Sequence, residues 1–179
     1  MKQLLVVMVL LLGCSNDTRE AESPKTSQAI EAGASPTPAP VPSADEKLIA
    51  DPIVEKGIWE RLNRPEGDLT EADLAEVKFL YLSNTQITDA GLKEVAQLQQ
   101  LAGLYLRNTQ ITDAGLKEVA KLQKLDFIDL SETQITDEGL TELAKLQQLE
   151  KLGLEGTQVT DTGVTELKKA LPNCTIVGP

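Results

Sequence analysis

The string TQITDAGL, residues 85–92, recurs unchanged at residues 109–116, then as TQITDEGL at 133–140 and as TQVTDTGV at 157–164. Each copy begins 24 residues after the one before it. A fixed period of this length is typical of stacked repeats, in which each unit buries its apolar face only against its neighbours. The string therefore predicts a quasi-linear stack of four units.

Two different hydrophobic patterns flank the repeated string. Before it, apolar residues follow the order apolar-x-x-apolar-x-apolar, and the last two alternate with an outward residue as in a strand. The four copies are Val77/Leu80/Leu82, Leu101/Leu104/Leu106, Leu125/Ile128/Leu130 and Leu149/Leu152/Leu154. After it, apolar residues lie three apart, as in Leu92, Val95 and Leu98, which is typical of a helical turn. Each unit is thus predicted to be a strand, a turn and a short helix.

The consensus LxxLxLxxTxITDxGLxxLxxLxx resembles the leucine-rich repeat of bacterial proteins over about residues 69–179. The resemblance implies an α/β fold: a short right-handed solenoid with a parallel β-sheet on its concave face and short helices on its convex face. Threonine stands where many family members carry asparagine. By resemblance these side chains point inward and bond the backbone of adjacent turns, which a hydroxyl can do. They are Thr85, Thr109, Thr133 and Thr157.

The chain before the first repeat predicts a helical N-terminal cap over residues 46–76, because an open end of the stack would expose its core. Asp51 followed by Pro52 is a helix start signal, and this helix is expected to stop near Pro65. A second short helix is expected after Thr70, since Asp73 three residues on completes a capping box.

The repeats are expected to span residues 77–172 and to end in a capping strand over residues 173–179. Leu171 and Pro172 break the last helix, and Cys174 alternates with Ile176 in the manner of a strand. We expect this strand to be out of register with the 24-residue step. Cys174 is interpreted as a buried small hydrophobe, and a reactive thiol is the alternative.

The first 13 residues have the layout of a secretory signal peptide, with Lys2, an apolar run from Leu4 to Leu12, and Gly13. The run Leu11-Leu12-Gly13-Cys14 resembles the bacterial lipobox, which implies cleavage before Cys14 and lipidation of that cysteine. An ordinary secretory cleavage beside a cysteine is the alternative. We therefore expect an exported protein, lipid-anchored in the bacterial cell envelope, in the outer membrane or at the cell surface rather than in the inner membrane.

Residues 14–45 predict a tether between the lipid anchor and the repeats. They contain five prolines among many Ser, Thr, Ala and Glu residues and almost no large apolar side chains. Such a segment cannot bury enough surface to offset its ordering entropy. If Cys14 carries lipid, Cys174 has no cysteine partner in the chain, and no disulfide is expected.

Charge and residue usage exclude several classes of function. The chain carries 17 basic and 28 acidic residues, a net charge of −11, and therefore repels the phosphates of nucleic acids. It has no histidine, which removes the commonest general base and metal ligand. No base accompanies a serine or cysteine, and no phosphate-binding loop is present. We expect no enzyme, no cofactor and no metal.

The outward residues of the predicted strands form a grid on the concave face. It contains all four Phe and Tyr residues of a chain that is only 3% aromatic, and outward aromatic side chains indicate a binding surface. The alternative is that they only favour β-structure and pair across strands. Arg107 is expected to be the single cation beside them. The predicted partner-binding residues are Phe79, Tyr81, Tyr105, Arg107, Phe127, Asp129 and Glu155.

The repeated aspartates at positions 89, 113, 137 and 161 are interpreted as helix caps, and the threonine before each is the alternative cap. A calcium site would need six to eight converging oxygens, which the sequence does not supply. The predicted function is a monomeric protein- or peptide-binding module of the cell envelope, with a partner that carries apolar and basic groups. It meets the membrane only through the lipid on Cys14. The alternative is a non-catalytic structural envelope protein without a specific ligand.

Overall fold

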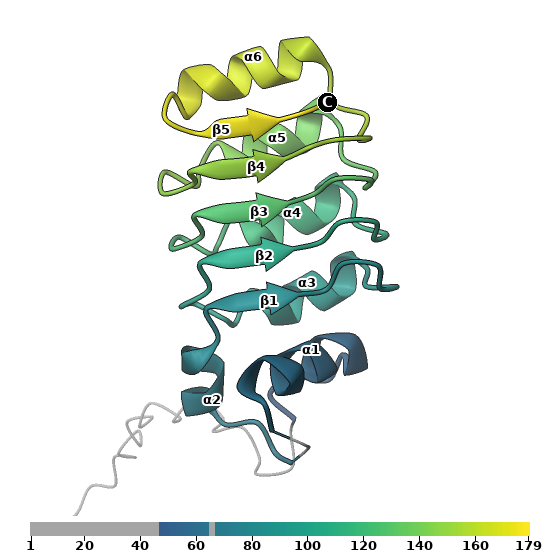
Figure 1. The fold of residues 1–179 in the computed structure, drawn as a ribbon, viewed down its shortest axis with the longest axis vertical. Helices are drawn as coiled ribbons and strands as arrows, with labels where there is room; N and C mark the ends of the chain where they lie inside the picture. Colours follow the sequence, from purple (N-terminus) through teal and green to yellow (C-terminus); the bar gives the residue numbers. More distant parts are fainter. Residues whose placement is uncertain (1–46, 65–66) are drawn as a thin grey trace, which may run out of the picture. The chain divides into compact units, whose positions relative to one another are not determined.

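Five parallel strands form one sheet in the described part of the chain, residues 47–64 and 67–179 of this computed structural model (Figure 1). The strands follow one another in chain order, and each pairs with the next at a step of 24 residues. Their bounds are β1 Phe79–Tyr81, β2 Gly103–Tyr105, β3 Phe127–Asp129, β4 Lys151–Gly153 and β5 Thr175–Val177. The predicted signal peptide and tether lie outside the described residues.

One helix follows each of the first four strands, and Figure 1 shows these helices on one side of the sheet. The helices are α3 Asp89–Val95, α4 Asp113–Val119, α5 Asp137–Leu143 and α6 Asp161–Ala170. Strand, turn and helix therefore make up each unit, and the α/β solenoid that the resemblance implies is confirmed. The helix ends earlier than the three-residue spacing predicts, since Leu98 lies in the turn after α3.

The core is a column of aliphatic side chains between the sheet and the helices. Each strand contributes its central residue, and Leu80, Leu104, Ile128 and Leu152 have no exposed surface. The isoleucine of the repeated string adds a second layer, in which Ile87, Ile111 and Ile135 are also fully buried. Burying one such side chain stabilises the fold by about 1.5–3 kcal/mol, so each repeat adds several such contributions.

The repeated aspartates join neighbouring coils. The carboxylate of Asp113 accepts hydrogen bonds from the backbone nitrogen of Thr136 at 2.9 Å and from its hydroxyl at 2.7 Å. Asp89 contacts Thr112, and Asp137 contacts Thr160, in the same way. The prediction that the aspartates cap their own helices is wrong, whereas the threonine prediction holds for α4, α5 and α6, whose N-cap hydroxyls accept a backbone N–H.

The glycine of the repeated string makes room for this link. A Cβ atom on Gly115, Gly139 or Gly163 would collide with the aspartate carboxylate of the preceding coil. Within the string TDxGL, the aspartate of one coil contacts the next coil, and the glycine of that next coil leaves space for the aspartate side chain. The hydrogen bonds from Thr160 hold the pKa of Asp137 below its ordinary value.

The inward threonines bond within their own turn. The hydroxyl of Thr133 donates to the carbonyl of Leu130 at 2.5 Å, and Thr109 donates to the carbonyl of Leu106 at 2.7 Å. Thr85 and Thr157 make the same bond three residues back. The prediction of bonds to adjacent turns is therefore wrong. Each hydroxyl has one proton and donates it to a carbonyl of its own coil, so it has no donor left for an adjacent turn.

Two helices cover the N-terminal end of the stack, α1 Pro52–Leu62 and α2 Glu71–Glu76. Asp51 caps α1, and Thr70 forms a capping box with Asp73, as their positions in the sequence predict. Gly57 lets α1 approach β1 closely, because a Cβ there would lie 2.9 Å from Cδ2 of Leu82. The first coil is thereby covered by a helix rather than by another repeat.

The last strand keeps the 24-residue step. β5 pairs with β4 so that Leu152 stands beside Ile176, which corrects the expected loss of register. The irregularity lies in the flanking positions, where Asn173 and Gly178 replace the repeat leucines while the central apolar residue is retained. Cys174 is buried, and burial raises the pKa of its thiol.

Candidate binding surface

Three aromatic side chains form a ladder across the first three strands. The rings of Tyr81 and Tyr105 stack with centroids 4.5 Å apart and planes 21° apart. Tyr105 then contacts Phe127, with centroids 4.7 Å apart and planes 38° apart. Such pairs contribute about 0.5–1.5 kcal/mol each beyond their buried area. We call Tyr81, Tyr105 and Phe127 the aromatic ladder.

The four aromatic residues differ in exposure, whereas their positions in the sequence predict that all four face solvent alike. Tyr81 is 56% exposed and Phe79 is 36% exposed, but Tyr105 and Phe127 are half-buried by their neighbours. The ring of Phe79 lies over Gly103, where a Cβ would come within 2.5 Å of its Cδ1 atom. Tyr81 therefore offers the most accessible aromatic surface on this face.

Two cations border the aromatic side chains in addition to the predicted Arg107. The guanidinium carbon of Arg61, on α1, lies 5.9 Å from the centre of the Phe79 ring. The ammonium of Lys151, on β4, lies 5.8 Å from the centre of the Phe127 ring. Both distances fit cation–π contacts. The prediction that Arg107 is the single cation of this surface is therefore wrong.

Arg107 is engaged by Glu132 of the next coil. Their side chains form an ion pair at 2.6 Å between Nη2 and Oε1, and this hydrogen bond raises the pKa of Arg107. Glu132 has a positive φ of 58°, at a turn position where two other repeats carry asparagine and one carries glycine. A residue other than glycine, asparagine or aspartate is uncommon in that backbone conformation. The ion pair thus occupies a turn whose backbone conformation favours other residues.

The acidic side of the surface is also ordered. Oδ1 of Asp129 accepts hydrogen bonds from the backbone nitrogen of Ser131 at 3.0 Å and from its hydroxyl at 2.6 Å. Burial raises the pKa of Tyr105, and the neighbouring Tyr81, Asp129 and Asp126 raise it further. The Tyr105 hydroxyl therefore stays protonated and can donate a hydrogen bond. Sequence reasoning missed Asp126, because it precedes the strand and is not part of the grid.

The structure brings the predicted partner-binding residues to one face, in two groups. Phe79, Tyr81, Tyr105, Phe127 and Asp129 lie on β1, β2 and β3, in the register that the grid predicts. Arg107 and Glu155 lie in the turns after β2 and β4, and both are exposed. Sequence reasoning missed Arg61, because the repeat does not predict where α1 lies relative to β1.

A surface hollow lies beside α1, and its charged side chains pair with one another. It has a volume of about 1030 Å³, and its lining includes Lys47, Glu55, Lys56 and Glu60. The first two are already joined at 2.9 Å and the last two at 3.8 Å. Residues 47–64 and 67–179 contain no cluster of three or more metal-binding side chains. In the same residues no helix is long and apolar enough to cross a bilayer.

Comparison with known proteins identifies repeats in this chain. Residues 77–96 and 121–144 match the family model described as Leucine Rich repeat. No curated protein sequence shows a significant match.

Among solved structures, the chain is similar to an internalin C2 of Listeria monocytogenes, at 27% identity and a TM-score of 0.53. That match covers 73% of this chain and 64% of the internalin. A second Listeria monocytogenes internalin, inlF, matches at 19% identity and a TM-score of 0.57, over 73% of this chain and 43% of that one. A Leptospira interrogans LRR protein matches at 25% identity and a TM-score of 0.42, over 63% and 34%. The chain thus spans less than two thirds of the length of these relatives.

Proposed function

Because the chain is a leucine-rich-repeat protein, we propose that it is a protein-binding module that takes a polypeptide segment on the aromatic ladder of its sheet. The ladder is the observation that carries this proposal. More than half of the Tyr81 side chain is exposed, whereas the aliphatic side chains of the core are almost completely buried. Exposed aromatic side chains on a rigid scaffold are the residues that dominate binding energy at protein interfaces.

The geometry of the ladder favours a polypeptide over a sugar. Stacking places the ring faces of Tyr105 between its neighbours, so that ring edges and hydroxyl groups are presented to a ligand. A sugar ring packs on an open aromatic face, whereas peptide side chains and backbone groups can contact edges and hydroxyls. The ladder therefore supports a partner with apolar side chains.

Charge supports a partner that also carries basic groups. Asp126 and Asp129 lie near Tyr105, in the middle of the ladder, and the chain has a net charge of −11. The cations Arg61 and Lys151 contact the outer aromatic rings, so a basic group of the partner would lie beside Tyr105. Arg107 contributes little free positive charge, since Glu132 holds it. Charge complementarity of this kind accelerates association and selects partners more than it raises affinity. The proposed mechanism contains no catalytic step.

The test compares two double variants of the full chain as bait for proteins of the solubilised envelope. Tyr81→Ala/Tyr105→Ala removes the ladder, and Lys93→Ala/Lys117→Ala is the matched control, since these lysines are exposed on the helices of the same two repeats. We expect a protein that wild type and the control retain and the ladder variant loses. If all three baits retained the same proteins, binding by the ladder would be contradicted and another surface would carry the binding. If no bait retained a specific protein, the result would support a structural role without a specific ligand.

We propose in addition that the module is anchored in the cell envelope by lipid on Cys14. The sequence of the lipobox supports this proposal, and the segment lies outside the described residues. Cys14→Ser should abolish metabolic labelling with a fatty acid and leave the fold unchanged. Labelling that persists in the Cys14→Ser variant would overturn the anchor but not the binding surface.

A further inference from the structure

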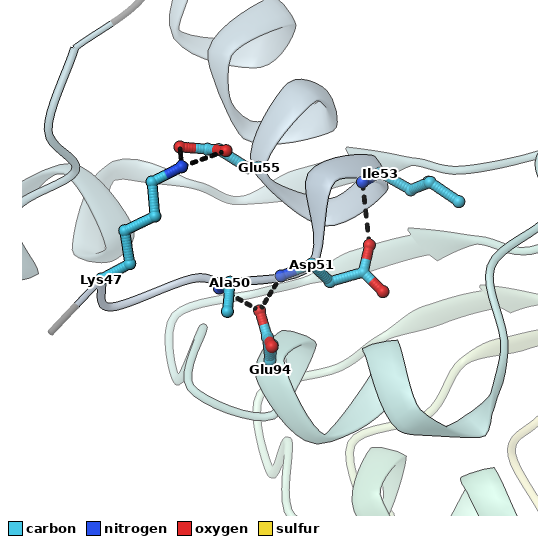
Figure 2. A network of polar contacts seen from close by, with 6 residues as sticks. All are labelled: Lys47, Ala50, Asp51, Ile53, Glu55 and Glu94. Carbon is cyan, nitrogen blue, oxygen red and sulfur yellow. Dashed lines mark hydrogen bonds and ion pairs between the residues drawn. The ribbon is translucent and has the colours of Figure 1, made fainter.

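A five-residue segment that precedes α1 lies against the first repeat on its helical side (Figure 2). We call residues 47–51 the strap. Oε2 of Glu94, on α3, accepts hydrogen bonds from the backbone nitrogens of Ala50 at 2.7 Å and Asp51 at 2.8 Å. The amide of Gln97 donates to the carbonyl of Leu48 at 3.0 Å. Two side chains of the first repeat thus hold three backbone groups of the strap.

The other repeats use the corresponding glutamate differently. Glu118, Glu142 and Glu166 each pair with a lysine three residues later, at 2.5 Å in every case. The lysines are Lys121, Lys145 and Lys169, and Gln97 stands in their place in the first repeat. A neutral amide leaves the Glu94 carboxylate free of the local ion pair that a lysine would form at this spacing. The departure from the repeat coincides with the docking of the strap.

We infer that Glu94 and Gln97 form a latch that docks the strap and thereby holds the N-terminal cap on the first repeat. Hydrogen bonds from backbone N–H groups to a carboxylate are stronger than neutral ones, and here one oxygen receives two of them. The strap also buries Ile49, which is 1% exposed. The strap is therefore held both by hydrogen bonds to the latch and by the burial of an apolar side chain.

Asp51 shows that the strap takes the place of a preceding coil. Its Oδ1 atom caps α1 by accepting from the nitrogen of Ile53 at 2.8 Å. Its Oδ2 atom would lie 2.8 Å from a Cβ on Gly91. In later repeats the same place beside the glycine holds the aspartate of the coil before. The strap thus fits the site at which each repeat receives its predecessor.

The latch also bears on the aromatic face, because α1 follows the strap directly and carries Arg61 beside Phe79. Release of the strap frees the start of α1 and with it the position of that cation. This consequence rests on the proposed function, whereas the latch itself does not. The single tryptophan, Trp59, is buried on α1 and reports on the seating of the helix.

The test is Gln97→Lys in the full chain, which gives Glu94 the partner found in the other repeats. Residue-level hydrogen exchange should show the amides of Ala50 and Asp51 exchanging about ten-fold faster or more. Glu94→Ala should have the same effect. The matched control is Lys121→Gln, which makes the reverse exchange in the second repeat and should leave both amides unchanged.

Unchanged exchange in Gln97→Lys would overturn the role of Gln97, and unchanged exchange in Glu94→Ala would overturn the latch. Equal acceleration in Lys121→Gln would assign the effect to general destabilisation and also overturn it. Fluorescence of Trp59 should shift to longer wavelength in the two latch variants only. The two proposals fail independently. Retained capture by Tyr81→Ala/Tyr105→Ala would overturn the binding surface and leave the latch standing, whereas unchanged exchange of the Ala50 and Asp51 amides in Glu94→Ala would overturn the latch and leave the binding surface standing.

Discussion

Replacing the inward hydroxyl of Thr133 tests whether a repeat depends on this side chain to supply a hydrogen-bond partner for a buried backbone carbonyl. Thr133→Val keeps the shape of the side chain but removes the donor that serves the carbonyl of Leu130 at 2.5 Å. Thr133 is 5% exposed, so water cannot readily replace the lost hydrogen bond. A buried group left without a partner costs about 1–3 kcal/mol. We therefore expect the free energy of unfolding to fall by about that amount.

Thr141→Val is the matched control, because its hydroxyl also donates to a carbonyl three residues back, that of Glu138 at 2.7 Å, but on an exposed helix. Solvent can serve that carbonyl, so the change should stay within about 0.5 kcal/mol. Urea unfolding followed by circular dichroism measures both variants. Equal losses of stability for Thr133→Val and Thr141→Val would refute the reasoning, since burial would then make no difference.

Further predictions concern the links between coils and the aromatic ladder. Gly139→Ala should destabilise the fold in thermal melts, because its Cβ collides with the carboxylate of Asp113, and the same substitution should cost less in an Asp113→Ala background, in which that carboxylate is absent. The pKa of Asp137 is lowered from 3.8, so its contribution to stability is present above pH 3.8 and is lost as the pH falls below that value. The difference in free energy of unfolding between wild type and Asp137→Asn should therefore shrink below pH 3.8. Spectrophotometric titration should show that Asp129→Asn lowers the raised pKa of Tyr105.

The period and the apolar pattern were enough to predict the sheet, because a parallel stack leaves one choice of register. Leu104 and Ile128 pair as their spacing of 24 residues requires, and a slip by one residue would turn both out of the core. The same alternation places Tyr81 and Tyr105 side by side on the opposite face. The strand part of the candidate surface was therefore predictable.

Contacts between coils were harder to predict. A repeated residue has the same sequence neighbours whether its side chain forms hydrogen bonds within its own coil or with the next coil. Its position before a helix predicts that Asp113 caps that helix, whereas its side chain reaches Thr136 of the following coil. The glycine in TDxGL was the available signal, since a position that excludes Cβ marks a close approach. Arg61 could not be placed, since α1 lies outside the repeat and no period relates it to Phe79.

The most direct measurement of the central claim is the affinity of the captured partner for wild type and for Tyr81→Ala/Tyr105→Ala, by titration calorimetry, with melting temperatures recorded for both. Loss of the two ladder rings should weaken binding by about 30-fold or more, as removal of interface anchors does. The melting temperature should fall, because the variant also loses the half-buried ring of Tyr105 and two ring contacts of about 0.5–1.5 kcal/mol each, so the affinity is measured at a temperature at which both proteins are folded. Lys93→Ala/Lys117→Ala should bind like wild type. Affinity of the ladder variant within about two-fold of wild type would contradict the account, because the binding energy would then come from another surface.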